Sequence, residues 1–299
     1  MTAFADRLAT AVRAKQSPLM VGLDPRRGQL PEALRPSDTA PPADVAAAYR
    51  AFCVAVIDSV ADLTPIVKPQ AAFFEQLGPA GLLALAEVVR HARDAGLLVC
   101  VDGKRNDIGS TAQAYADGWL GAASAWGGDA LTVSPYLGDD SLTPFVDIAQ
   151  DRDAGVFVLV KTSNPGGALW QDLDAEGEKL YRRVGTHVEQ LSAATAGPSG
   201  YGVAGAVVGA TYPEQLAELR ATMPHTWFLV PGFGAQGGAA ADVAGGFDAD
   251  GLGAVVNSSR GVIFAYEKNP TADWRDAVRD AAVVARQQLL AHTPAGRLS

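Results

Sequence analysis

Short apolar runs alternate with amphipathic stretches along most of this chain. Eight of the runs have the length of a β-strand, and the stretches between them place apolar residues at helical spacing. This alternation is typical of parallel sheets, because parallel strands need a long connection that is usually a helix. The sequence predicts strands at residues 19–23, 65–67, 97–101, 130–133, 156–160, 204–208, 227–230 and 254–256.

The helical spacing is clearest in residues 44–60. Val45, Tyr49, Phe52 and Val56 recur at intervals of three or four residues, which puts them on one face of a helix that can pack on a sheet. The same kind of pattern recurs between the other runs. Helices are predicted at residues 44–60, 80–94, 110–126, 174–191, 213–221 and 272–290.

Eight alternating units in 299 residues predict a (β/α)₈ TIM barrel, and a doubly wound open sheet is the alternative. An open sheet usually carries a Gly-rich nucleotide loop after its first strand. Here the sequence DPR follows the first strand, whereas the Gly-rich turn 231–238 follows the seventh, where barrels often bind phosphate. Because no linker is visible, we expect one domain over residues 1–299, with long loops at 27–42, 164–178 and 193–202.

The net charge and the first residues of the chain limit which ligands and which cell compartment we expect for the protein. A formal net charge of −9 argues against a surface for nucleic acid or anionic membranes, so an anionic ligand needs a local group of cations. The first residues lack the apolar segment of a signal peptide or a membrane span. We therefore expect a cytoplasmic protein.

The cysteines and histidines give no sign of a metal site. Cys53 lies on a helical apolar face and Cys100 inside a strand, so two buried thiols in a reducing compartment are expected instead of a disulfide. The four histidines are scattered and have no zinc-ligand spacing. No metal site is predicted.

Charged residues follow the third apolar run, 97–101, at once. Asp102 and Lys104 are two positions apart, so an extended backbone would project both side chains to the same side. Asp107 lies three residues further on, and either Asp107 or Ser110 could cap the helix that follows. A simple strand-end salt bridge is the alternative, but three charges in one place after a buried strand are typical of functional sites.

Polar side chains also follow most of the other predicted strands. In a barrel, the carboxyl ends of all strands open onto one face, so these side chains would meet there. The Gly-rich turn and Arg260 together could bind a phosphate, although each could also be an ordinary surface feature. The strand-end residues are Asp24, Lys68, Asp102, Lys104, Ser163, Gln236 and Arg260.

Motifs spread over most of the chain resemble one known family. The sequence DGKRNDI at residues 102–108 is the most specific of them, and GLDPR begins at residue 22. Four shorter motifs occur in the same order as in that family: VKP at 67–69, TSNPG at 162–166, PGFGAQGG at 231–238 and SRG at 259–261. Together they resemble the orotidine 5′-phosphate decarboxylase family.

The resemblance implies a cofactor-free decarboxylation of orotidine 5′-monophosphate (OMP) to UMP and CO₂ in pyrimidine biosynthesis, on a homodimeric barrel. It implies an alternating array of Lys68, Asp102, Lys104 and Asp107, in which Lys104 protonates C6 of the pyrimidine ring. Asp107, Ile108 and Thr111 would reach into the site of the neighbouring subunit. Four further roles are implied by similarity: Asp24 binds the ribose hydroxyls, Ser163 the pyrimidine edge and Arg260 the phosphate, and Gln236 bridges toward the phosphate.

Two other functions remain open at this point. Sugar-phosphate decarboxylases and aldolases of the same superfamily share the D-x-K-x-x-D pattern but use Mg²⁺. The resemblance to those enzymes implies an acidic metal ligand at the position where this chain has Lys68. An ammonium group at that position repels a divalent cation, so Lys68 argues against the Mg²⁺-dependent reaction. A non-catalytic phosphate-binding barrel is the second alternative. It would bind UMP without releasing CO₂.

Overall fold

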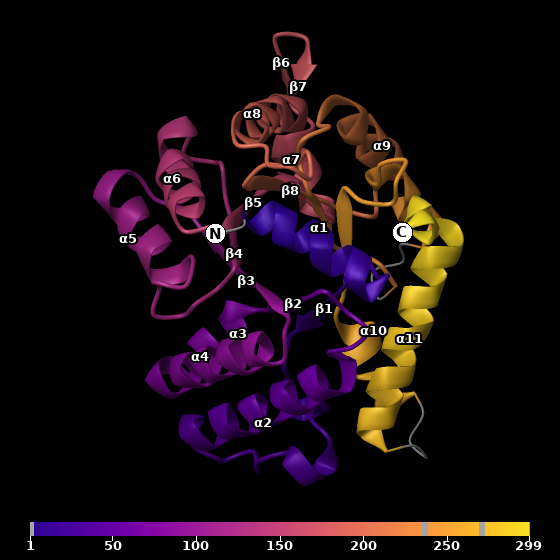
Figure 1. Ribbon diagram of the computed structural model, residues 1–299. Helices are drawn as coiled ribbons and strands as arrows, with labels where there is room; N and C mark the ends of the chain where they lie inside the picture. The colour runs from indigo at the N-terminus through magenta and orange to yellow at the C-terminus, as the bar shows by residue number, and fades with distance from the viewer. Residues whose placement is uncertain (1–2, 235–238, 269–272, 299) are drawn as a thin grey trace.

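Eight parallel strands form a closed barrel in the computed structural model, which describes residues 3–234, 239–268 and 273–298. The predicted barrel is confirmed, and the open sheet is excluded, because β10 pairs with β1 and closes the ring. Figure 1 shows the helices around this ring. The strands, in order around the barrel, are β1 (Leu19–Leu23), β2 (Ile66–Pro69), β3 (Leu98–Arg105), β4 (Ala130–Val133), β5 (Gly155–Lys161), β8 (Ala204–Val208), β9 (Phe228–Val230) and β10 (Ala254–Ser258).

The helices cover the outside of the barrel with the apolar faces that the sequence predicts. In α2 (Pro42–Val60), for example, Val45, Tyr49, Phe52 and Val56 are all buried. Both thiols are buried and free, as expected, and no helix in the described ranges combines the length and apolarity needed to cross a membrane. The α-helices that follow α2 are α3 (Ala71–Glu75), α4 (Gly78–Asp94), α5 (Gly109–Trp119), α6 (Thr143–Asp151), α7 (Ala168–Gln171), α8 (Leu180–Ala194), α9 (Pro213–Thr222), α10 (Arg260–Ile263) and α11 (Trp274–His292).

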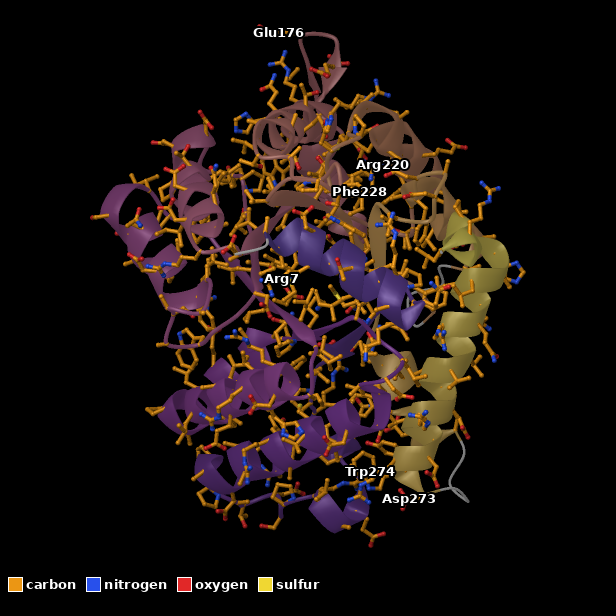
Figure 2. The ribbon with its side chains drawn as sticks, in the orientation of Figure 1. Arg7, Glu176, Arg220, Phe228, Asp273 and Trp274 are labelled. Carbon is orange, nitrogen blue, oxygen red and sulfur yellow. The ribbon has the colours of Figure 1, made fainter. Side chains whose placement is uncertain are left out.

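Two predicted helices are wrong at one end. The helix predicted at 174–191 begins only at Leu180, because β6 (Asp174–Ala175) and β7 (Glu178–Lys179) form a hairpin first. Its two turn residues, Glu176 and Gly177, both have positive φ, which suits a tight hairpin turn. Glu176 marks the tip of this hairpin in Figure 2.

The helix predicted at 110–126 is α5, which starts at Gly109 and ends at Trp119. No side chain caps its first turn, so the expected cap from Asp107 or Ser110 is wrong. The Asp107 carboxylate instead accepts a hydrogen bond from the backbone N–H of Ile108, its own neighbour, at 2.8 Å. The sequence analysis also missed α1, α3, α6, α7 and α10.

The missed helix α1 (Phe4–Lys15) lies across one end of the barrel (Figure 1). Phe4 packs edge-to-face on Phe157, and Leu8 is buried. Arg7, marked in Figure 2, donates at 2.8 Å to Asp129, which immediately precedes β4. These contacts join α1 to the amino-terminal side of the strands. The carboxyl ends of the strands lie on the opposite side.

Two of the three segments expected as long loops carry short elements of their own. Segment 27–42 contains η1 (Arg27–Gln29) and η2 (Glu32–Leu34), and the backbone N–H of Arg27 donates to the Tyr49 hydroxyl at 2.9 Å. Segment 164–178 contains η4 (Pro165–Gly167), α7 and the first part of the hairpin. Segment 193–202 begins with the last two residues of α8 and has no helix or strand after them, and it contacts α1 through Ser199, whose N–H donates to Asp6 at 2.8 Å.

Candidate active site

Six of the seven strand-end residues lie at one end of the barrel. Lys68 belongs to β2, and Asp102 and Lys104 belong to β3. Asp24 follows β1 directly, and Arg260 begins α10 just after β10. Ser163 comes two residues after β5. Gln236, the remaining candidate, lies outside the described residues.

Asp102 lies between two ammonium groups. Its Oδ2 accepts a hydrogen bond from Lys68 Nζ at 2.6 Å, and its Oδ1 accepts one from Lys104 Nζ at 2.5 Å. The Lys68 and Asp102 side chains are only 6% and 10% exposed, whereas the Lys104 side chain is 49% exposed. Lys104 therefore presents its ammonium group to solvent or to a ligand, while Lys68 is held behind Asp102 in the barrel.

The buried pair keeps its charges. Burial alone would lower the pKa of Lys68, but the attraction of Asp102 and Asp24 outweighs burial and raises that pKa above its ordinary value. Burial alone would raise the pKa of Asp102, but Lys68 and Lys104 outweigh it and hold the pKa of this carboxyl well below its usual range. Both groups are therefore ionised at neutral pH.

The backbone at Lys104 differs from a regular strand. Its φ is +45°, in the left-handed region that side chains other than glycine rarely adopt, and the register between β3 and β4 shifts between Val101 and Arg105. Asp102 and Lys104 still meet, as predicted, but an irregular turn of the chain brings them together. The backbone N–H of Lys104 donates to the hydroxyl of Thr132 on β4 at 2.9 Å. The sequence analysis missed Thr132, because it is the single polar residue within the apolar run 130–133.

Asp24 is fixed by a second residue that sequence reasoning did not single out. The Ser259 hydroxyl donates to Asp24 Oδ2 at 2.6 Å, and this contact needs glycine at position 22, where a Cβ atom would lie 2.7 Å from the Ser259 Cβ. Asp24 Oδ1 is buried and accepts no hydrogen bond from the residues that the structure describes. A hydroxyl group of a ligand could satisfy this oxygen.

The loop that carries Ser163 is held by α7. Gln171 accepts from the backbone N–H of Thr162 at 3.0 Å and donates to the hydroxyl of the same residue at 2.8 Å. The fully buried Lys161 pairs with Asp172 at 2.5 Å, just after α7. A cavity of about 480 Å³ adjoins this loop and is lined by Ser163, Asn164, Pro165, Thr211 and Tyr212.

The fourth member of the expected array does not join the other three within one chain. Asp107 is partly exposed, and in the described ranges it makes no hydrogen bond or ion pair with Lys68, Asp102 or Lys104. Ile108 is 53% exposed, and Thr111 is exposed on the first turn of α5. A single chain thus brings together three of the four charges.

The geometry does not favour a metal ion at Asp102. Both of its carboxylate oxygens are hydrogen-bonded to ammonium groups, which repel a divalent cation. In the part of the chain that the structure describes, no three His, Cys, Asp or Glu side chains are arranged to hold a metal ion. A larger cavity of about 840 Å³ lies beside Arg7 and Asp129 on the amino-terminal side of the barrel, away from these charges.

Comparisons with known proteins agree with the architecture and the motifs. A protein of Rhodopirellula baltica named orotidine 5′-phosphate decarboxylase is 57% identical to this chain, over 97% of the chain and 99% of its own length. One of the same name from Deinococcus radiodurans is 42% identical, over 96% of both chains. The solved structure of Leishmania donovani OMP decarboxylase superposes with a TM-score of 0.76 at 38% identity, over 97% of this chain and 99% of that one. The sequence model of the orotidine 5′-phosphate decarboxylase / HUMPS family matches residues 17–277. This chain therefore belongs to the orotidine 5′-phosphate decarboxylase / HUMPS family.

Proposed function

We propose that this protein converts OMP to UMP and CO₂ in pyrimidine biosynthesis, in the cytoplasm and without a cofactor. The observation that carries the proposal is the Lys68–Asp102–Lys104 cluster, with ion-pair distances of 2.6 and 2.5 Å, at the carboxyl ends of the strands. Asp102 and Lys104 lie in the DGKRNDI motif and Lys68 in the VKP motif, in a chain that is 57% identical to a relative named orotidine 5′-phosphate decarboxylase. Lys68 favours this reaction over the Mg²⁺-dependent chemistry of the superfamily.

The reaction needs a positive charge beside C6 of the pyrimidine ring. When the bond between C6 and the carboxylate breaks, CO₂ leaves and the electron pair of that bond stays on C6. The half-exposed ammonium group of Lys104 would stabilise this carbanion and then donate a proton to it. The products are UMP and CO₂, and Lys104 regains its proton from water.

Asp102 and Lys68 would prepare Lys104 for this step. Asp102 orients the Lys104 ammonium group before substrate arrives, so little reorganisation is needed during the reaction. Lys68, buried behind Asp102, offsets the cost of burying that carboxylate. The substrate carboxylate would also lie near Asp102, and their repulsion would be relieved as CO₂ leaves.

The binding roles follow the resemblance. Asp24 would bind the ribose hydroxyls, and its buried, unpartnered Oδ1 supports this role. Ser163 would bind the pyrimidine edge, and its loop is fixed by Gln171 through Thr162. Arg260 would bind the phosphate through two parallel hydrogen bonds. Gln236 would bridge toward the phosphate.

A second copy of the chain would complete the site as a homodimer. Asp107, Ile108 and Thr111 would then enter the partner's site, and Asp107 would flank the partner's Lys104. Supporting this, three large side chains with apolar surface are exposed in this region: Tyr115 on α5 is 37% exposed, and Tyr136 and Leu137, in the loop leading to η3 (Asp139–Ser141), are 79% and 49% exposed. The η3 helix contacts α5, which begins directly after Ile108.

The basic test is the conversion of OMP by the purified chain. We expect UMP and CO₂ to form at a rate that EDTA does not change, measured by loss of OMP absorbance and by trapping of CO₂. Loss of activity with EDTA, restored by Mg²⁺, would favour the metal-dependent alternative. Binding of UMP without CO₂ release would favour a non-catalytic phosphate-binding barrel.

Mixed dimers test whether Asp107 acts across the interface. Lys104→Ala and Asp107→Ala chains should each be nearly inactive alone. Equal amounts, refolded together, should recover about a quarter of wild-type activity, because half of the dimers then contain one chain of each kind and one intact site. If Asp107 served its own chain, every site would lack one residue and mixing would restore nothing. Each variant refolded alone is the control.

A further inference from the structure

The hydroxyl group of Thr132 links the two charged residues of β3 to β4. Thr132 is 2% exposed and belongs to β4, next to the irregular end of β3. Its Oγ1 accepts a hydrogen bond from the backbone N–H of Lys104 at 2.9 Å and donates one to Asp102 Oδ1 at 3.0 Å. Thr132 lies outside all six of the sequence motifs that carry the resemblance.

The direction of these two bonds is determined by their partners. A backbone N–H can only donate and an ionised carboxylate can only accept, so the single hydroxyl proton of Thr132 must point to Asp102. The same Asp102 oxygen accepts from the Lys104 ammonium at 2.5 Å. Thr132 therefore restricts the position of Asp102 Oδ1 and, through the main chain, the position of Lys104.

The backbone of Lys104 needs such a restraint. A φ of +45° is strained for a lysine, and it persists only where the surroundings hold it. The Thr132 hydroxyl oxygen accepts a hydrogen bond from the backbone N–H of Lys104 at the point where the regular pairing of β3 with β4 is interrupted. Without this acceptor, the chain at Lys104 could relax toward an ordinary extended conformation, which would redirect the side chain.

We propose that Thr132 is a positioning residue: its hydroxyl holds the backbone of Lys104 and the Asp102 carboxylate so that the Lys104 ammonium group stays aimed at the reacting carbon. This inference rests on the proposed decarboxylation, which it deepens. Thr132 would not touch the substrate. Its effect should therefore appear in kcat and not in the binding of UMP.

Valine in place of Thr132 removes the hydroxyl group and keeps the shape of the side chain. We expect Thr132→Val to lower kcat about 10- to 100-fold, since small misplacements of a reacting group have effects of this size. The KM for OMP and the Kd for UMP should change less than about threefold. Thr132→Ser keeps the hydroxyl and should retain most of the wild-type kcat.

A second buried threonine provides the matched control. Thr64 is fully buried just before β2, and its hydroxyl group donates a hydrogen bond to the backbone oxygen of Leu19. These two residues lie at the end of the barrel opposite to Lys68. Thr64→Val should lower stability to urea about as much as Thr132→Val does, while its kcat stays within about twofold of wild type. Comparing the two variants separates loss of a buried hydrogen bond from loss of alignment.

Several outcomes would overturn the inference. A Thr132→Val enzyme with wild-type kcat would do so, as would an equal loss of kcat in Thr64→Val or a failure of Thr132→Ser to restore the rate. If Thr132→Val does not fold, Thr132→Ser is still expected to be active, and an inactive but folded serine variant would contradict the proposal. A wild-type protein inactive toward OMP would overturn the proposed function together with this role, whereas an active wild type with an unaffected Thr132→Val would count against Thr132 alone.

Discussion

Replacement of Lys104 by alanine should remove decarboxylation almost completely, by about 10⁴-fold or more in kcat, because both the charge beside C6 and the proton donor are lost. The fold should tolerate the change. The Lys104 side chain is 49% exposed, and Asp102 keeps its 2.6 Å ion pair with Lys68. Single-turnover kinetics with OMP would measure the loss, and titration with UMP would measure binding, which should change less than about threefold.

Arg260→Ala provides the opposite pattern for comparison. Loss of two charge-assisted hydrogen bonds to phosphate should raise the Kd for UMP about 100-fold or more. Lys104→Ala should leave this Kd nearly unchanged. The assignment of Lys104 would be refuted by normal turnover in its alanine variant, and the assignment of Arg260 by unchanged UMP binding.

Asp102→Asn should reduce both stability and activity. The substitution leaves the Lys68 ammonium group buried, with only 6% of its side chain exposed, beside a neutral amide. Breaking a buried ion pair in this way typically costs about 3–5 kcal/mol of unfolding free energy. Urea unfolding at a fixed chain concentration would measure the loss. Decarboxylation should fall as well, because Lys104 loses the carboxylate that orients it.

The stability difference between wild type and Asp102→Asn should depend on pH in a defined way. The pKa of Asp102 is lowered from 3.8 in the folded protein. Its contribution to the free energy of unfolding is therefore complete above pH 3.8 and disappears as the pH falls toward the pKa of the folded state. Lys68 has a pKa raised from 10.5, so its contribution is complete below that pH and disappears only in stronger alkali. The difference should therefore be constant across neutral pH and should shrink in strong acid.

A surface pair provides the control for Asp102→Asn. Asp62 forms a 2.7 Å ion pair with Arg279, and the two side chains are 60% and 44% exposed. Asp62→Asn should cost no more than about 1 kcal/mol, because water already screens both charges. If the two asparagine variants were equally stable, or if Lys68→Met failed to recover stability when combined with Asp102→Asn, the buried pair would not have the role assigned to it.

The sequence alone was sufficient to predict the barrel and to predict where in it most of the candidate site residues lie. Alternating strand and helix patterns predict parallel strands, and residues at the carboxyl ends of parallel strands share one face, so Lys68, Asp102 and Lys104 could be placed together from their positions. Local patterns were less reliable at element ends. The start of α8 at Leu180 depended on a two-residue turn at Glu176 and Gly177 that helical spacing concealed.

Only the tertiary structure decided how the site is held. The left-handed backbone of Lys104 cannot be read from the sequence pattern. The hydrogen bond between Lys104 and Thr132 joins residues 28 positions apart in the chain, and the one between Ser259 and Asp24 joins residues 235 positions apart. Periodicity describes which face a side chain occupies within one element, but such contacts depend on how strands far apart in the sequence are packed. For the same reason, the sequence defines the position of Asp107 in the chain but not its contacts: within one chain its carboxylate accepts a hydrogen bond from the N–H of Ile108 and does not reach Lys68, Asp102 or Lys104 in the described residues.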